Sequence, residues 1–324
     1  MLIRFFKNNS FIQFLGLLIL GTGLWVAVFK NPPPIAETSF TSPFYNLAVT
    51  ITENHLILIL LSFIILFIQA IYLNQILIKH ELISRNTFLT AFVYFVLMSH
   101  SLALQHLYPS LIASIFILIA IDALLDIELK AEFYRLSFRA GFNIGLASLF
   151  YFPSAVLLLF IWAVLFIYRI PNWRTWVIPI IGILTPYLFL FTYYFWNDTA
   201  LDYLFHYQNY FMDMKFKFES ARGVESIIIT ILAFFMALSL LRVMGRINEK
   251  KIVIRKKISI MFNLFFMGII ILFVNNGLIS DSGIIYIPVA IFLSIFFSDI
   301  RKLFWTDLIF SLTVFFIIYM HFQV

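Results

Sequence analysis

Two hydrophilic stretches of this chain gather the residue types that an enzyme acting on a phosphate compound needs. The first, residues 30–54, contains the carboxylates Glu37 and Glu53. A carboxylate can act as general base on an acceptor hydroxyl while Lys or Arg holds a departing phosphate. An amphipathic loop with an aromatic belt at a membrane interface is the alternative, and it stays open. The second stretch, residues 197–223, contains Asp198, Asp202, Tyr203, His206, Tyr207, Tyr210, Phe211, Asp213, Lys215, Lys217, Glu219 and Arg222.

A second group of chemically able residues lies inside an apolar segment. Asp122 and Asp126 are four residues apart, which places both on one face of a helix. Such a pair can bind a cation or relay protons. Alternatively, Asp126 lies at a membrane interface and Asp122 pairs with a nearby arginine such as Arg139. Asp307 is best explained as a first-turn acid favoured by the helix dipole.

The histidines do not form a metal-binding pattern. A metal site on one helix requires two histidines three or four residues apart, or a set of histidines and carboxylates. His100 and His106 are six residues apart. The chain contains no cysteine, which excludes disulfides, thiolate metal sites and cysteine nucleophiles. We therefore predict neither a metal nor another cofactor.

Composition indicates what surrounds these residues. The chain is 63% hydrophobic and 12% charged, with a mean hydropathy of +1.00. Soluble domains are roughly 45–50% apolar and about 25% charged, so this chain needs lipid as its solvent. We predict one all-α integral membrane domain over residues 1–324, with the lipid bilayer as its partner. No basic, aromatic-interleaved soluble patch suggests binding to nucleic acid.

Long apolar runs predict about eleven transmembrane helices. One run, residues 140–152, is only 13 residues long. At 1.5 Å per residue it spans about 20 Å of the roughly 30 Å hydrocarbon core, so we interpret it as one arm of a hairpin closed by Pro153. The expected helices cover 11–29, 55–78, 88–104, a segment from 109 to about 126, 140–152, 154–170, 176–196, 226–244, 258–274, 284–297 and 307–322.

The basic residues predict the orientation of these helices. Of the 22 Lys and Arg residues, 18 fall in stretches on one side of the predicted bundle. Because positive residues favour the cytosolic side, the N-terminus is predicted inside and the C-terminus outside. Residues 30–54 and 197–223 then face outward. The four basic residues on that outer side are Lys30, Lys215, Lys217 and Arg222.

Three short segments resemble a known family. They are Arg139-Ala-Gly-Phe-Asn-Ile-Gly-Leu-Ala-Ser-Leu-Phe-Tyr-Phe-Pro153, Gly182-Ile-Leu-Thr-Pro186-Tyr and Tyr193-Tyr194-Phe. Together with the N-terminal Arg4-Phe5-Phe6, they resemble an uncharacterised family of polytopic inner-membrane proteins in Bacteroidota. The resemblance extends over much of the chain and implies the bacterial cytoplasmic membrane. Members are often labelled carotene monooxygenases, but this chain lacks the set of histidine ligands that an iron oxygenase needs.

The same region also resembles the short hairpin of the GT-C superfamily, read as Ala-Gly-x-x-x-Gly-Leu-Ala ending in Pro153. Those multi-spanning glycosyltransferases use polyprenyl-phosphate sugars, so the resemblance implies a polyprenyl-phosphate lipid as substrate. The superfamily's acid early in the first outer loop is matched here by Glu37, without an adjacent acid. Gly141 and Gly145 form a GxxxG pattern, which predicts close helix packing.

Three functions are consistent with these observations. The first is a GT-C-like glycosyltransferase at the outer face of the inner membrane, with Glu37 as base. In that function Lys217 or Arg222 holds the phosphate, and Asp202 and His206 contact the substrate. The second is a non-catalytic subunit of an envelope complex that binds other membrane proteins. The third is an ion-coupled transporter that uses Asp122 and Asp126.

Overall fold

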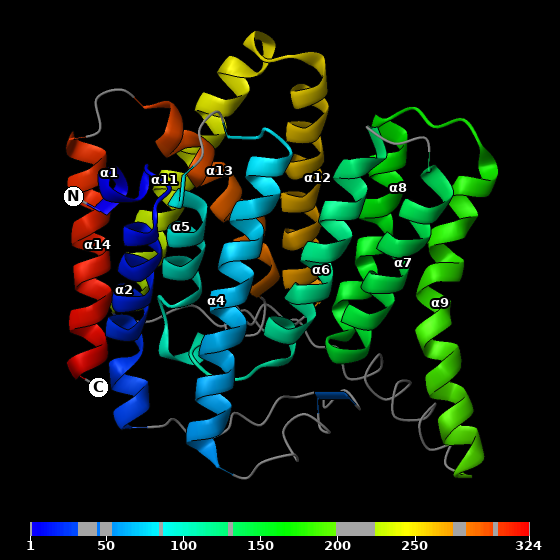
Figure 1. The fold of residues 1–324 in the computed structure, drawn as a ribbon, viewed down its shortest axis with the longest axis horizontal. Coiled ribbons are helices and arrows are strands. Elements are labelled where there is room, and N and C mark those ends of the chain that lie inside the picture. Colours follow the sequence, from blue (N-terminus) through cyan, green and yellow to red (C-terminus); the bar gives the residue numbers. More distant parts are fainter. Residues whose placement is uncertain are drawn as a thin grey trace.

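The chain folds as a bundle of helices that run up and down between two ends (Figure 1). The computed structural model describes residues 2–31, 44–45, 54–83, 87–128, 132–198, 224–274, 283–300 and 304–323, and these contain no strand. The α-helices are α1 (Leu2–Phe6), α2 (Phe11–Lys30), α4 (His55–Lys79), α5 (Leu89–Met98), α6 (Pro109–Leu125), α7 (Phe133–Phe150), α8 (Leu157–Ile167), α9 (Trp173–Trp196), α11 (Val224–Arg246), α12 (Ile252–Val274), α13 (Tyr286–Asp299) and α14 (Phe304–Gln323). Short 3-10 turns are η1 (Leu102–Leu104), η2 (Asp126–Glu128), η3 (Phe152–Val156), η4 (Ile247–Glu249) and η6 (Gly283–Ile285).

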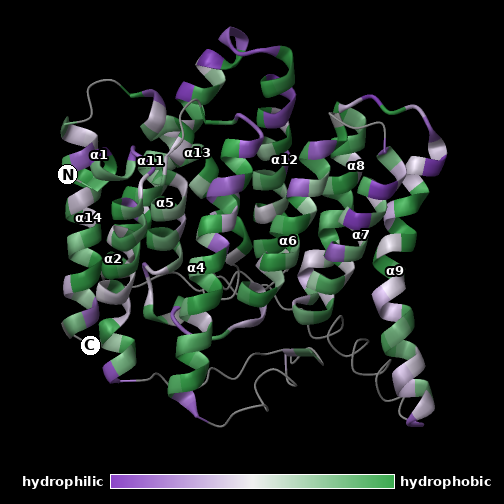
Figure 2. Cartoon of the chain, viewed as in Figure 1, coloured by the Kyte–Doolittle hydropathy of each residue, from purple (hydrophilic) through white to green (hydrophobic). Residues whose placement is uncertain are grey.

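The long helices carry the surface of a multi-pass membrane protein. Within the described ranges, six helices are long and apolar enough to cross a membrane: α2, α4, α9, α11 continued by η4, α12 and α14. Only 28–39% of the apolar window in each is buried inside the protein. Their outer faces are therefore apolar surface of the kind that a lipid bilayer covers. Figure 2 shows hydrophobic residues along the helices and hydrophilic ones gathered toward the upper end. Eleven spans and the inside N-terminus stay predictions.

The two ends of the bundle differ in character. One end, uppermost in Figure 1, holds the C-terminus of α4, the α8–α9 turn and η4. We call it the basic end, because Arg169, Arg174, Arg246 and Lys250 lie in those turns or at the helix ends next to them. The opposite end holds the segment Phe44–Tyr45 and the C-terminus of α9.

The predicted short arm is longer than its apolar run. Helix α7 begins at Phe133 rather than at residue 140, so Arg135 and Arg139 lie in the helix and not in a loop. Its 18 residues span about 27 Å. Glu132 and Arg135 form an ion pair at 2.6 Å that supports the polar first turn. Hydropathy does not reveal this first turn of α7, because a polar segment can form helical backbone hydrogen bonds without apolar side chains. The predicted hairpin itself is present as α7, η3 and α8.

The third predicted helix, 88–104, is interrupted. Helix α5 ends at Met98, and η1 follows after Ser99. Trp25 Nε1 donates to Ser99 Oγ at 2.9 Å, and Gln105 Nε2 donates to the Ser99 carbonyl at 2.8 Å. Side chains thus satisfy the polar groups that the helix ladder leaves open. Buried side-chain hydrogen bonds therefore stabilise the chain where the helix is interrupted between α5 and η1.

Asp307 has a partner that the sequence did not indicate. It lies in the first turn of α14, almost fully buried. Its Oδ1 accepts the backbone N–H of Ile3 at 2.9 Å, and Ser311 Oγ accepts the N–H of Leu2 at 3.2 Å. Lys7 Nζ donates to the carbonyls of Ser298 and Ile300, both at 3.3 Å. The short helix α1 is therefore fastened to the C-terminal part of the bundle.

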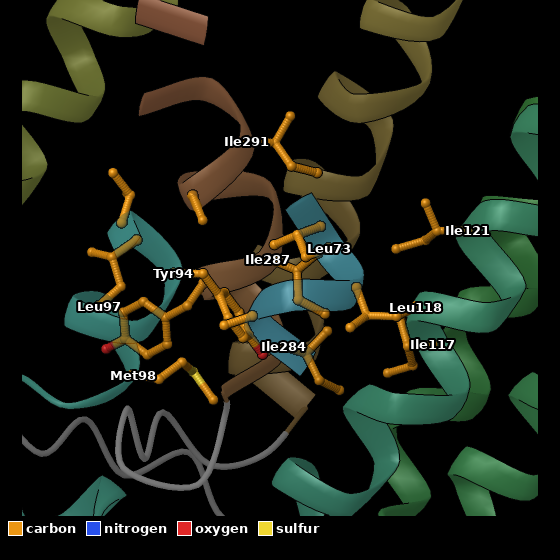
Figure 3. Close-up of a cluster of buried hydrophobic side chains, with 14 of the residues drawn as sticks. Leu73, Tyr94, Leu97, Met98, Ile117, Leu118, Ile121, Ile284, Ile287 and Ile291 are labelled. Atoms are coloured by element: carbon orange, nitrogen blue, oxygen red, sulfur yellow. The ribbon is translucent and has the colours of Figure 1, made fainter. Parts of the chain in front are cut away.

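The central core lies between α4, α5, α6 and α13. Figure 3 shows side chains from these helices pointing toward one another. Tyr94 lies within this core, and its hydroxyl donates to Gln69 Oε1 at 3.0 Å. Gln69 Nε2 in turn donates to the Leu111 carbonyl at 2.6 Å. The interior is thus filled mainly by hydrocarbon, with each of these polar groups hydrogen-bonded.

Helices α7 and α9 make the closest backbone contact described here. A Cβ built on Gly141 would lie 2.4 Å from the Pro179 carbonyl oxygen, and one on Gly145 would lie 2.7 Å from the Ile183 oxygen. From the other side, a Cβ on Gly182 would lie 2.7 Å from the Phe138 oxygen. The predicted role of the GxxxG pattern in close packing is confirmed. The contacts also show that α7 and α9 run parallel, with α8 returning between them.

Replacing Gly141 with alanine should destabilise the protein. The new Cβ meets backbone atoms of α9, which cannot move aside as the tip of a side chain can. We expect a loss of about 1–3 kcal/mol in unfolding free energy. Thermal unfolding of the purified protein in detergent measures this loss.

The matched control is Gly23→Ala in α2, where an added Cβ meets no atom within 4 Å. Alanine favours a helix over glycine by about 1 kcal/mol, so this variant should be unchanged or slightly more stable. Equal losses in both variants would show that the α7–α9 contact is not what makes Gly141 necessary.

Candidate functional site

The five site residues expected from the sequence lie outside the described residues. They are Glu37, Asp202, His206, Lys217 and Arg222. The structure does describe the parts of the chain next to them. Phe44 and Tyr45 belong to the hydrophilic stretch that contains Glu37, and the end of α9 leads into the stretch that contains the other four. These flanking parts form a site of their own.

Two described residues of the first hydrophilic stretch, Phe44 and Tyr45, contact the bundle. The Tyr45 hydroxyl donates to the Leu107 carbonyl at 2.9 Å, just before α6 begins. The Phe44 ring lies 5.6 Å from the Phe150 ring at the end of α7, and Phe150 stacks on Phe116 of α6 at 5.7 Å. Aromatic pairs at such distances add stability beyond the area they bury. Phe44 therefore has a defined position beside α7.

An apolar pocket opens between Phe44, α7 and α9. Its volume is about 470 Å³, within the range of small-molecule sites. Phe142, Leu146 and Leu149 recur along one face of α7, as helical spacing requires. The remaining lining residues come from α9 and from the Phe44 segment: Phe44, Pro186, Phe189, Leu190, Tyr193 and Tyr194. The two tyrosines carry the only hydroxyl groups among these lining side chains.

The pocket forms because α9 extends further than α7 toward the end of the bundle opposite the basic end. Gly141 lies beside Pro179, and Gly145 lies beside Ile183. In that register α7 stops at Phe150 while α9 continues to Trp196. Figure 1 shows α9 reaching past α7 at the end opposite the basic end. Phe44 closes one side of the space that this overhang leaves.

The acidic pair on α6 takes part in a charge cluster at the basic end. Lys79 Nζ lies 2.7 Å from Asp122 Oδ1 and 3.1 Å from Asp126 Oδ2. His80 Nε2 lies 3.0 Å from the same Asp122 oxygen. The sequence suggested a nearby arginine such as Arg139 as one possible partner of Asp122. The structure corrects this: α4 brings Lys79 and His80 against α6, and these two residues contact Asp122.

This charge cluster joins three helices. The His80 side chain is fully buried, the carboxylates are nearly so, and the Lys79 side chain is 47% exposed. Lys257 of α12 is also buried, and its Nζ donates to the His80 carbonyl at 3.2 Å. An ammonium group already occupies the place between the two carboxylates that a transported cation would need. The arrangement favours a structural role for the pair.

Two buried histidines, His100 and His321, each contact a backbone carbonyl. His100 Nδ1 lies 2.7 Å from the Leu97 carbonyl, and His321 Nδ1 lies 3.2 Å from the Leu24 carbonyl. Burial lowers the pKa of His106, which lies beside Tyr108 in the turn before α6. Among the described residues, no three histidine or acidic side chains are placed to hold a metal ion.

The sequence analysis missed the pocket residues, although part of the signal was present. Phe142, Leu146 and Leu149 follow the helical period, as do Pro186, Leu190 and Tyr193 on α9. The same period marks any buried helix face, so it does not distinguish a pocket from a core. The overhang of α9 and the position of Phe44 decide which of the two forms.

Replacing Lys79 with methionine should destabilise the bundle, because it leaves two nearly buried carboxylates without their ammonium partner. Removing one partner of a buried pair costs about 3–5 kcal/mol, and the exposure of Lys79 reduces this to about 1–3 kcal/mol. Adding Asp122→Asn to Lys79→Met should recover part of the loss. Thermal unfolding of the single and double variants measures the coupling.

Arg135→Gln is the control for this cycle, since it breaks an ion pair whose side chains are 69% and 53% exposed. Such pairs contribute less than about 1 kcal/mol. A Lys79→Met variant no less stable than Arg135→Gln would contradict the structural role of the charge cluster.

Comparison with known proteins provides no match for this chain: no family model, no curated protein and no solved structure aligns with it significantly. Neither fold nor function can therefore be transferred from a relative. Functional inference rests on the residues of the chain and on the geometry of its pocket.

Proposed function

We propose that this chain is a membrane glycosyltransferase of the GT-C type, acting at the outer face of a bacterial inner membrane. Its donor is a sugar carried on a polyprenyl phosphate. The observation that carries the proposal is the apolar pocket between Phe44, α7 and α9. A hydrocarbon chain is the ligand that such a lining accepts, because the lining residues offer almost no hydrogen bonds.

The position of the pocket supports a lipid donor. Phe44 follows Glu37 by seven residues, and Tyr194 precedes Asp202 by eight. Along the chain, residues that line the pocket therefore adjoin both hydrophilic stretches, which contain the proposed reacting groups. Much of α9 around the pocket is exposed apolar surface, including Leu188 and Phe191, and needs lipid contact. A polyprenyl tail can enter such a site sideways from the bilayer, with its phosphate toward the hydrophilic stretches.

The proposed reaction uses one base and one cationic group. Glu37 accepts the proton of the acceptor hydroxyl as that oxygen bonds to the anomeric carbon of the sugar. The bond between the anomeric carbon and the phosphate oxygen breaks, and the electron pair leaves with the lipid phosphate. Lys217 or Arg222 stabilises this departing phosphate. Asp202 and His206 orient the sugar.

A non-catalytic subunit of an envelope complex is the alternative, since an apolar pocket can also hold a structural lipid. Ion-coupled transport has less support, because Lys79 Nζ lies between the carboxylates that would bind the ion. Catalysis and lipid binding are therefore tested separately.

Leu190→Trp should block the pocket, since Leu190 lines it and is only 9% exposed. We expect binding of undecaprenyl phosphate to weaken by about tenfold, as expected from the loss of one or two kcal/mol of apolar contact. Titration of the lipid into purified protein, followed by native mass spectrometry, measures binding.

Leu188→Trp is the control for Leu190→Trp. It makes the same change two residues away, on the face of α9 where Leu188 is 64% exposed. Its binding should match that of the wild type. Equal binding by both variants would place the lipid elsewhere.

Glu37→Gln should abolish most sugar transfer while leaving lipid binding intact. A general base contributes about 10²–10⁴-fold to rate, so the expected loss lies in that range. Transfer from undecaprenyl-phosphate-linked sugars by protein in nanodiscs is the measurement, and Glu53→Gln is the control in the same stretch.

The two measurements separate the functional alternatives. Lipid binding without turnover of any donor would favour the non-catalytic subunit. Turnover that survives Glu37→Gln would leave the enzyme but remove its proposed base.

A further inference from the structure

The hairpin formed by α11, η4 and α12 projects beyond the other helices at the basic end (Figure 1). We define it as the basic hairpin, residues 241–257. It contains seven Lys and Arg residues and one acid, Glu249. Figure 2 shows hydrophilic residues at its tip and hydrophobic ones below. This surface lies at the opposite end from the apolar pocket and has no part in the proposed transfer.

Ion pairs within the described part of the chain involve few of the cations in the basic hairpin. Lys250 lies 3.8 Å from Asp299, at the end of α13. Among the described residues, by contrast, Arg242, Arg246, Lys251 and Arg255 form no ion pair. These four side chains therefore keep their charge available to an external anion.

Two arginines carry a more specific signal. Arg242 on α11 and Arg255 on α12 are both half-buried. The Nε atom of each is shielded from water and has no hydrogen-bond acceptor within the described part of the chain. A shielded guanidinium N–H without an acceptor is unfavourable, and phosphate oxygens match its geometry. Each arm of the hairpin thus offers one incompletely satisfied guanidinium.

Apolar side chains surround these cations. Leu241 is 70% exposed and Met244 56% on α11, and Ile252 is 68% exposed on α12. Exposed aliphatic residues interleaved with arginine and lysine fit the boundary between acyl chains and head groups. Water alone would not favour this pattern, and a free phosphate ion would not use the apolar part.

We propose that the basic hairpin binds anionic phospholipids, with the guanidiniums of Arg242 and Arg255 each available to a head-group phosphate and the neighbouring aliphatic residues against the acyl chains. Charge complementarity selects the anionic head group, because each basic residue near the surface favours it. The site lies in the leaflet at the basic end and acts independently of the donor pocket.

The test counts lipids bound to the full-length protein in detergent by native mass spectrometry. Phosphatidylglycerol and phosphatidylcholine of the same acyl chains are compared. The wild type should bind phosphatidylglycerol in clear preference, and Arg242→Gln/Arg255→Gln should weaken that binding by about tenfold. Equal binding of both lipids by the wild type would overturn the proposal without reference to any variant.

The matched control is Arg169→Gln/Arg174→Gln, which removes the same charge from two exposed arginines at the same end. It should keep the preference. An equal effect of both double variants would indicate net charge rather than a site. Inorganic phosphate is added as competitor in a parallel titration. Displacement of the lipid by millimolar phosphate would indicate a small-anion site instead of a lipid site.

Discussion

The backbone contact between α7 and α9 is the constraint on which the candidate site depends. Gly141, Gly145 and Gly182 leave no room for a Cβ, so the two helices meet in one register only. That register sets where α7 ends beside α9. The overhang of α9 and the pocket follow from it. In a bilayer, where apolar faces gain little from meeting each other, such close packing of small residues is a main source of helix association.

Polar contacts then specify which helices pair, because the apolar faces alone could pack together in several ways. Lys79 and His80 join α4 to α6, and Lys257 adds α12 at the same end. Asp307 fastens the first helix to the last. Each contact is directional, and its acidic or histidine side chain is largely shielded from water, so misalignment would leave a buried polar group without a partner. Hydrocarbon packing supplies most of the contact area, and these few groups specify which helices are neighbours.

The two proposed roles belong to opposite ends of the protein. An apolar pocket whose lining residues adjoin two hydrophilic stretches along the chain suits the proposed lipid-linked substrate, and a projecting basic hairpin suits the head groups of the other leaflet. Between them lies a core filled by side chains such as Tyr94 and Ile287, shown in Figure 3.

The sequence by itself determined the helical membrane class, the position of most helices along the chain and the close packing at Gly141 and Gly145, although not the helix that packs there. Apolar length and residue size are local properties, and the bilayer makes them decisive. It did not determine the start of α7, the break after Met98 or the partners of Asp122, because these depend on side chains far away in the chain. Nor did it reveal the pocket, whose lining has the same period as a core face. Only the tertiary structure decided that one such face lies open beside Phe44, because it sets the relative depth of α7 and α9.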